Sequence, residues 1–243
     1  MTVERRVALV TGAAKRIGRA IALRLARRGY SIAVHYHLSG GEARKTCEEC
    51  HRLGVHASCF QADLADDDAP RMLAKSVLSR FGRLDVLVNN ASVFERMNVA
   101  GFDRTAWDRT LAINVSAPMA LTAALAEALR AARGRVVNLG DAGVRRAWPN
   151  HLAYITSKGA LETLTRTLAR GLAPEVTVNA VAPGIAAWPD DYDAATRERL
   201  LAQVPLARSG TPEDVAAAVE YFVCEAEYVT GVVLPVDGGR EIV

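Results

Sequence analysis

Three residues of this chain could carry out proton transfer if the fold brings them together. Lys158 follows Tyr154 by four residues, and Asp141 precedes Tyr154 by thirteen. A spacing of four places two side chains on the same face of a helix. An ammonium group beside a phenol favours the phenolate, so we expect the pKa of Tyr154 to fall from its ordinary value of about 10 toward neutrality. The pair is therefore a candidate centre for proton exchange.

The carboxylate at position 141 bears on which substrate such a centre could take. A neutral hydroxyl there could donate to the carbonyl oxygen of an alcohol or ketone, whereas a carboxylate would repel the oxyanion that forms on it. A carboxylate instead suits a substrate that is rich in N–H donors. Asp141 therefore predicts a nitrogen-containing substrate rather than a simple carbonyl compound.

Short apolar runs alternate with longer amphipathic stretches along the whole chain. The short runs are rich in Val and Ile and lack a clean period of two, which is typical of strands covered on both faces. This alternation predicts one α/β domain over residues 1–243, with a parallel, doubly wound sheet of about seven strands flanked by helices. The expected strands are 7–10, 31–36, 57–61, 86–88, 135–139, 176–181 and 232–236, and the expected helices are 17–28, 41–52, 70–80, 107–132, 154–172 and 212–224.

The composition argues against several classes of protein. A formal net charge of +3 is too small to indicate nucleic acid as a partner, and no long basic tract is present. No apolar stretch has the length of a membrane span or of a signal-peptide core, so we expect a cytoplasmic protein.

Cys47 and Cys50 form a C-x-x-C with His51 beside it, but no second such pair follows. We therefore expect no metal site.

A glycine-containing turn follows the first expected strand directly and opens a helix. It reads T-G-A-A-K-R-I-G over residues 11–18. Small residues at this point let phosphate groups approach the backbone and the N-terminus of the helix. Gly12, Ile17 and Gly18 are therefore candidate cofactor contacts. Arg16 is either a tolerated surface residue or, as we favour, a cation directed at phosphate or substrate.

These features together resemble the short-chain dehydrogenase/reductase family, over essentially the whole chain. The resemblance rests on the glycine turn, on the Tyr154–Lys158 pair, on Asn114 forty residues before Tyr154, and on Asn90 and Ala91 in an N-N-A turn after the fourth strand. It implies a Rossmann-type fold in which Asn114 bends a helix and supports a proton-relay water. It also implies that Lys158 binds the nicotinamide ribose. In the same way, Pro183 and Gly184 are expected to border the nicotinamide.

The end of the second expected strand indicates which nicotinamide cofactor is used. Its sequence, H-Y-H-L-S over residues 35–39, has no carboxylate to bind the ribose hydroxyls of NAD and to repel a 2′-phosphate. We therefore predict NADP(H), although whichever of the two histidines faces the core could be an ordinary strand residue. Leu38 departs from the reductases that this chain resembles, which often have an arginine there to bind the 2′-phosphate. The further expected cofactor contacts are His35, Tyr36, His37, Ser39, Asp63, Leu64, Asn90, Ala91 and Ser92.

The departures from the usual family pattern occur together in its pteridine reductase branch. The shared motifs are T-G-A-A-K-R-I-G, H-Y-H-x-S, N-N-A-S-x-F and an aspartate before Y-x-x-x-K. The resemblance implies NADPH-dependent reduction of a dihydropteridine, with oxidised pterins and dihydrofolate as further candidates. It implies that Phe94 stacks on the flat ring unless it packs in the core. The expected substrate contacts are Arg16, Ser92, Phe94, Asp141, Tyr154 and Trp188, the last in a lid or plain loop at residues 185–195.

Two other functions stay open at this point. One is the reduction of 3-oxoacyl thioesters, sugars or steroids by an enzyme of the same family. The other is a non-catalytic NADP(H)-binding protein, against which Tyr154, Lys158 and Asn114 argue, because binding alone needs no tuned phenol. In the family, helices corresponding to residues 107–132 and 154–172 form dimer faces, and the Asp237-Gly238-Gly239 end packs at another interface. We therefore expect a homotetramer.

Overall fold

Seven parallel strands form one sheet in the order β3-β2-β1-β4-β5-β6-β7. The computed structural model describes residues 5–188 and 192–243. The predicted fold class, a doubly wound α/β sheet flanked by helices, is confirmed. The strands are β1 (Val7–Val10), β2 (Ser31–Tyr36), β3 (Ala57–Gln61), β4 (Val86–Asn89), β5 (Arg135–Leu139), β6 (Thr177–Pro183) and β7 (Val233–Val236).

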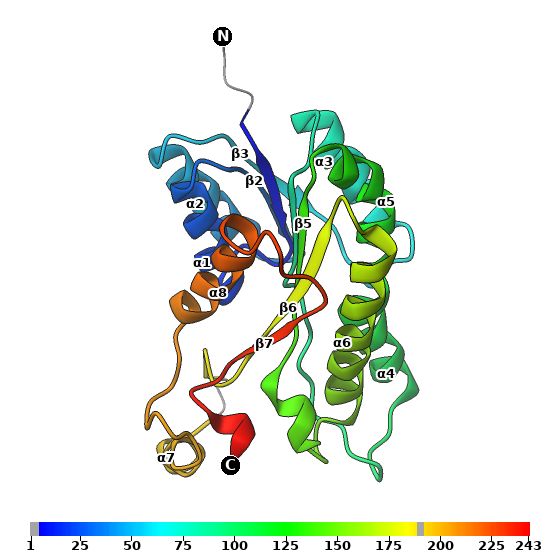
Figure 1. Cartoon of the computed structure of the whole chain (residues 1–243). Helices are drawn as coiled ribbons and strands as arrows, with labels where there is room; N and C mark the ends of the chain where they lie inside the picture. The colour runs from blue at the N-terminus through cyan, green and yellow to red at the C-terminus, as the bar shows by residue number, and fades with distance from the viewer. Residues whose placement is uncertain (1–4, 189–191) are drawn as a thin grey trace.

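Helices cover both faces of the sheet, which explains why its strands are apolar on both sides (Figure 1). One layer contains α1 (Arg16–Arg27), α2 (Gly40–Arg52) and α8 (Pro212–Cys224). The other contains α3 (Ala69–Phe81), α5 (Ala117–Ala131) and α6 (Leu152–Leu172). Strand order reverses between β1 and β4, and a crevice at such a switch point is where doubly wound sheets bind ligands.

The prediction of a single regular helix over residues 107–132 is wrong. The structure divides this region into α4 (Arg104–Leu111), a π-helical turn at Ala112–Ser116, and α5. Such a turn adds a residue to the helical repeat and is common at functional sites. Asn114 lies in this turn, where the family resemblance implied that the helix is irregular.

A short helix, α7 (Ala194–Leu201), was not predicted and begins inside the segment expected to be a lid. Asp193 caps it by accepting a hydrogen bond of 2.8 Å from the backbone N–H of Thr196. Figure 1 shows α7 beyond the carboxyl ends of the strands, at the same end as the C-terminal turn. The other predicted boundaries match the observed ones or differ from them by one or two residues.

Candidate active site

A cavity of about 1060 Å³ opens at the carboxyl ends of the central strands. Its walls come from the loops that follow β1, β4, β5 and β6, from the first turns of α6, from α7 and from the C-terminal turn. A volume at the upper end of the usual range for ligand pockets leaves room for a dinucleotide and a second flat molecule. The predicted residues that line it are Gly12, Arg16, Ile17, Gly18, Asn90, Ala91, Ser92, Phe94, Asp141, Tyr154, Lys158, Pro183, Gly184 and Trp188.

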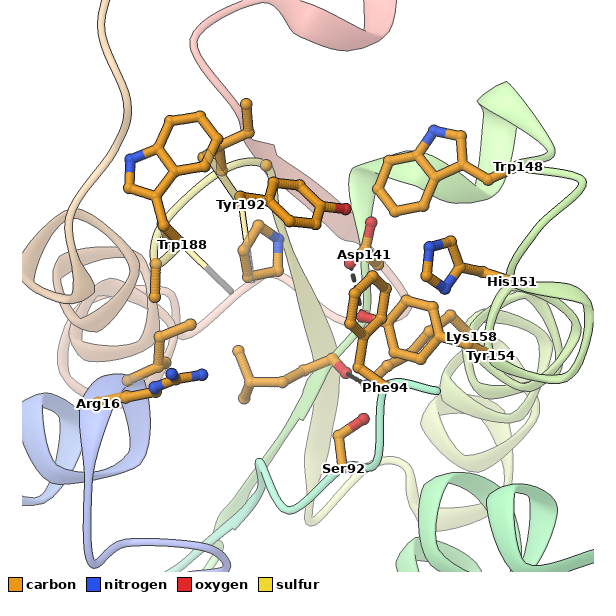
Figure 2. A pocket seen from close by; sticks show the side chains of 18 of the residues that line it. Arg16, Ser92, Phe94, Asp141, Trp148, His151, Tyr154, Lys158, Trp188 and Tyr192 are labelled. Carbon is orange, nitrogen blue, oxygen red and sulfur yellow. Dashed lines mark hydrogen bonds between the residues drawn. The ribbon is translucent and has the colours of Figure 1, made fainter. Parts of the chain in front are cut away.

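The predicted proton-transfer residues meet at one wall of this cavity (Figure 2). The hydroxyl of Tyr154 donates to Oδ2 of Asp141 over 2.6 Å. The other carboxylate oxygen, Oδ1, accepts from the backbone N–H of Gly143 over 2.7 Å. Lys158 donates from Nζ to the carbonyl oxygen of Leu139 over 2.7 Å, and Nζ lies 5.6 Å from the centre of the Tyr154 ring. Helix α6 therefore aligns the phenol and the amine, while the end of β5 brings the carboxylate to the phenol.

The expected fall in the pKa of Tyr154 is not found. Burial raises the pKa of this phenol well above 10, and the negative charge and hydrogen bond of Asp141 raise it further. Burial also raises the pKa of Asp141, against the hydrogen bonds from Tyr154 and Gly143. The charge of Lys158 favours the phenolate, but the Asp141 carboxylate at 2.6 Å opposes a second negative charge beside it. Tyr154 therefore keeps its proton at neutral pH.

Lys158 responds to the same burial in the opposite direction. Loss of contact with water lowers the pKa of its ammonium group from 10.5 to about 8, while the charge of Asp141 raises it. The site therefore contains a protonated phenol beside a lysine that titrates just above neutrality. This arrangement can donate a proton to a bound molecule.

Asn114 supports the site from behind the cavity wall. It is buried, its Oδ1 accepts from the N–H of Val93 over 3.0 Å, and its Nδ2 donates to the carbonyl oxygen of Val93 over 3.2 Å. Nδ2 also donates to Oγ of Ser157 over 3.0 Å, and that hydroxyl donates to the carbonyl oxygen of Tyr154 over 2.6 Å. Asn114 thus joins the Phe94 loop to α6. Its part in a proton relay stays a prediction.

The glycine turn brings backbone groups close to the cavity. Gly12 has a φ of +63°, and a Cβ on Gly18 would lie 2.2 Å from the carbonyl oxygen of Gly12. Asn90 closes the turn from β4 by donating to the carbonyl oxygens of Thr11 over 2.7 Å and Gly12 over 3.2 Å. The first turn of α1 has no side-chain cap, since Lys15 occupies the capping position. This combination of small residues, uncapped N–H groups and a cation fits the pyrophosphate of a dinucleotide.

Arg16 adopts a backbone conformation that favours glycine. Its φ is +50°, and a left-handed conformation costs a residue with a side chain roughly 1–2 kcal/mol. Figure 2 shows its side chain at the cavity, opposite the Asp141–Tyr154 pair. Retaining an arginine where the turn favours glycine is consistent with a ligand-binding cation.

His35 is corrected from a cofactor contact to a residue that supports the turn. It is almost fully buried, its Nδ1 accepts from the N–H of Gly12 over 3.1 Å, and its Nε2 lies 3.2 Å from the carbonyl oxygen of Ala62. Burial lowers its pKa to about 4, so the imidazole is neutral and carries its proton on Nε2. The side chain of Leu64 is buried in the core, and its contact with the cofactor stays a prediction.

The remaining residues predicted near β2 and β3 lie outside the cavity lining. His37 Nε2 is 3.6 Å from Oδ2 of Asp63, whose Oδ1 accepts from the N–H of Ala65 over 3.0 Å. The ring of Tyr36 packs beneath Gly40, where a Cβ would lie 3.2 Å from it. Contact of Tyr36, His37, Ser39 and Asp63 with the adenosine end of a cofactor stays a prediction.

Aromatic side chains form a large part of the cavity lining around Tyr154. Phe94 is 42% exposed, which argues against the alternative of core packing. It stacks on His151 with ring centres 4.3 Å apart and meets the Tyr154 ring edge-on at 4.7 Å. The ring centres of Trp188 and Tyr192 lie 6.4 Å apart, and the expected lid residues Pro189, Asp190 and Asp191 lie outside the described residues.

Several lining residues were missed from the sequence. Trp148 and His151 lie between β5 and α6, where aromatic residues just before Tyr154 were a signal that could have been used. Three arginines from distant parts of the chain were also missed: Arg96, Arg199 and Arg240. Nothing in their sequence spacing relates them to one another, because only the fold brings them to the cavity.

A doubly wound sheet with a glycine turn at its switch point and a paired tyrosine and lysine defines a nicotinamide-dependent oxidoreductase. The family model described as enoyl-(acyl carrier protein) reductase matches residues 12–241. The chain belongs to the short-chain dehydrogenase/reductase family, and the predicted nicotinamide cofactor is confirmed at the level of that family.

Similar proteins include members with different activities. A 3-oxoacyl-[acyl-carrier-protein] reductase FabG of Staphylococcus aureus is 37% identical, with 96% of each chain covered. The structure of FolM, alternative dihydrofolate reductase 1 of Brucella canis, complexed with NADP, has a TM-score of 0.92 and 36% identity over 99% of this chain and 96% of that one. A blue fluorescent protein from a metagenomic library, in complex with NADPH, has a TM-score of 0.92 and 33% identity over 99% of both chains. The comparisons therefore show that this chain is an oxidoreductase of the family, while the substrates of its relatives differ.

Proposed function

We propose that this protein is an NADPH-dependent pterin reductase that converts a dihydropteridine to a tetrahydropteridine. The observation that carries the proposal is the buried Asp141 carboxylate, 2.6 Å from the hydroxyl of Tyr154 and on the wall of the cavity. Reduction of a ketone would build negative charge on an oxygen beside this carboxylate, where a stabilising donor is needed instead. A pterin presents amino and ring N–H groups, which a carboxylate can accept.

Each residue of the site has a separate role in the reduction of a C=N bond. When bound, NADPH supplies the hydride. Tyr154 supplies the proton from its hydroxyl, which keeps that proton at neutral pH because of burial and of Asp141. Asp141 accepts N–H groups of the substrate and orients Tyr154. Lys158, 5.6 Å from the phenol ring, offsets the charge left on Tyr154 once its proton has moved.

The aromatic wall supports the same substrate class. The exposed ring of Phe94 stacks on His151 and lies nearly perpendicular to the Tyr154 ring, and these two contacts fix it as a surface for a flat heterocycle. Asn114 fixes the loop that carries Phe94. Ser92 and Arg16 add polar contacts for the substrate edge and the cofactor phosphates. FolM of Brucella canis, described as an alternative dihydrofolate reductase, also supports a pterin-type substrate.

Reduction of 3-oxoacyl thioesters is the second candidate function, favoured by the 37% identity to FabG of Staphylococcus aureus. A steady-state assay of NADPH oxidation with dihydrobiopterin, dihydromonapterin, dihydrofolate and an acetoacetyl thioester separates the two. We expect turnover of at least one dihydropterin and little or none of the thioester. Turnover of the thioester without turnover of any pterin would reject the proposed function. NADPH binding without oxidation by any of these compounds would instead favour a non-catalytic protein.

A further inference from the structure

Arg240 is a buried cation on the wall of the active-site cavity, in a position that the proposed chemistry has not yet used. It begins the C-terminal 3-10 turn at Arg240–Ile242 and is only 7% exposed. Its Nε is buried and has no hydrogen-bond partner among the residues that the structure describes. A buried donor without an acceptor costs free energy. The position therefore calls for an acceptor from outside the chain.

The turn that carries Arg240 is held by its backbone. The Asp237 carboxylate accepts from the N–H groups of Gly239 over 2.9 Å and Glu241 over 2.6 Å. Arg146 donates from Nη1 to the carbonyl oxygen of Arg240 over 2.8 Å. These bonds fix the main chain without using the guanidinium group of Arg240.

The side chain reaches the same wall as Asp141. Its guanidinium carbon lies 5.5 Å from the centre of the Trp148 ring. That ring packs on Gly143, where a Cβ would lie 2.6 Å from Cζ2 of Trp148, and the N–H of Gly143 donates to Asp141. Burial lowers the pKa of Arg240, while the negative charge of Asp141 raises it, so the two groups act on each other. The wall thus places an unused donor near an acceptor.

We propose that Arg240 is a substrate-recognition residue that donates to the ring carbonyl oxygen of the pterin, on the edge whose N–H groups Asp141 accepts. This inference rests on the proposed function and narrows the substrate to 2-amino-4-oxo heterocycles. Such a ring presents a carbonyl oxygen next to an N–H group, and a guanidinium beside a carboxylate is complementary to that pair. A 2,4-diamino ring replaces the carbonyl oxygen with an amino donor, which would face the guanidinium without an acceptor.

The test measures binding of two ring analogues to the enzyme loaded with NADP. The ligands are pterin, which has the 4-oxo group, and 2,4-diaminopteridine, which lacks it. The variants are Arg240→Met, Arg240→Lys and the matched control Arg145→Met. Arg145 is exposed and pairs with Glu241 over 2.7 Å in the same turn, but it does not line the cavity. The control therefore removes a neighbouring positive charge without touching the site.

We expect Arg240→Met to weaken pterin binding by roughly tenfold to a hundredfold, and to leave 2,4-diaminopteridine binding unchanged. Arg240→Lys should restore part of the loss, and Arg145→Met should change neither Kd. Equal weakening of both analogues by Arg240→Met would overturn the inference, because a disturbed fold would affect both. Unchanged pterin binding would overturn it as well. A native enzyme that binds neither analogue but reduces an acetoacetyl thioester rejects the proposed function itself, and the inference with it.

Discussion

Asp141 and Tyr154 form a coupled pair in which each residue changes the chemistry of the other. The 2.6 Å hydrogen bond uses the tyrosine proton, and burial of both groups opposes ionisation of either. A serine at position 141 would remove the negative charge by which Asp141 raises the pKa of Tyr154, and would leave burial as the main cause that raises it. The carboxylate instead keeps Tyr154 protonated and offers an acceptor to the substrate, which is the residue-level basis of the proposed specificity.

Lys158 is predicted to set an alkaline limit on activity. Its buried ammonium has a pKa of about 8, below the ordinary 10.5, so it loses its charge as the pH rises through that value. The neutral amine no longer offsets the charge left on Tyr154 after proton donation. We therefore expect kcat/KM for a dihydropterin to fall as the pH rises through about 8, since this parameter reports groups of the free enzyme.

The control for this prediction is the Kd of NADPH over the same pH range, which separates catalysis from cofactor binding. A kcat/KM that stays constant from about pH 7 to pH 9 would contradict the role of Lys158.

At the scale of elements, the strands were predictable because burial on both faces leaves continuous Val-rich and Ile-rich runs. The π-helical turn at Ala112–Ser116 was not, because its residues have no periodicity distinct from an α-helix. Tyr154, Lys158 and Asn114 were found from spacing within or between regular elements. Spacing could not predict that the pKa of Tyr154 is raised. This shift depends on burial and on the hydrogen bond between Asp141 and Tyr154, which lie in different elements.

The burial of His35 in β2 was also not predictable from the sequence, and it leads to a prediction about how stability depends on pH. Its pKa is about 4 in the folded protein against 6.5 ordinarily, because burial opposes the charged form. The unfolded chain therefore binds more protons between these two pH values. The stability that this group contributes is fully present above about pH 6.5 and is lost as the pH falls toward 4, by about 3 kcal/mol in all.

Denaturant unfolding of the native protein, His35→Gln and the control His37→Gln at several pH values checks this, because the side chain of His37 is partly exposed. We expect His35→Gln to remove much of the fall in the free energy of unfolding between about pH 6.5 and pH 4, and His37→Gln to retain it. Identical pH slopes in all three proteins would contradict the buried, neutral His35.

At the scale of the whole molecule, the run from Arg104 to Ala131 indicates an interface. The prediction that no apolar stretch has the length of a membrane span is corrected here, because by length and composition this run is apolar enough to cross a membrane. Its mean hydropathy is 1.4, and 39% of the window is buried. It flanks α6, the second helix that the sequence analysis assigned to a dimer face. Apolar surface of this extent on a helix is more stable when covered.

We predict that a second copy of the chain covers this helix within a homotetramer. Sedimentation equilibrium should give a mass of four chains, each of 26.1 kDa. A charged substitution at Met119, which is 41% exposed on α5, should lower that mass. A native mass equal to one chain would contradict the prediction.

The central claim is that the Asp141 carboxylate selects a pterin over a carbonyl substrate. The most direct measurement is the ratio of kcat/KM for a dihydropterin to that for an acetoacetyl thioester, in the native enzyme and in Asp141→Ser, with the Kd of NADPH as a control for folding. We predict that Asp141→Ser lowers pterin kcat/KM by roughly a hundredfold, does not lower thioester turnover, and leaves cofactor binding intact. Pterin turnover that is unchanged in Asp141→Ser would contradict the account.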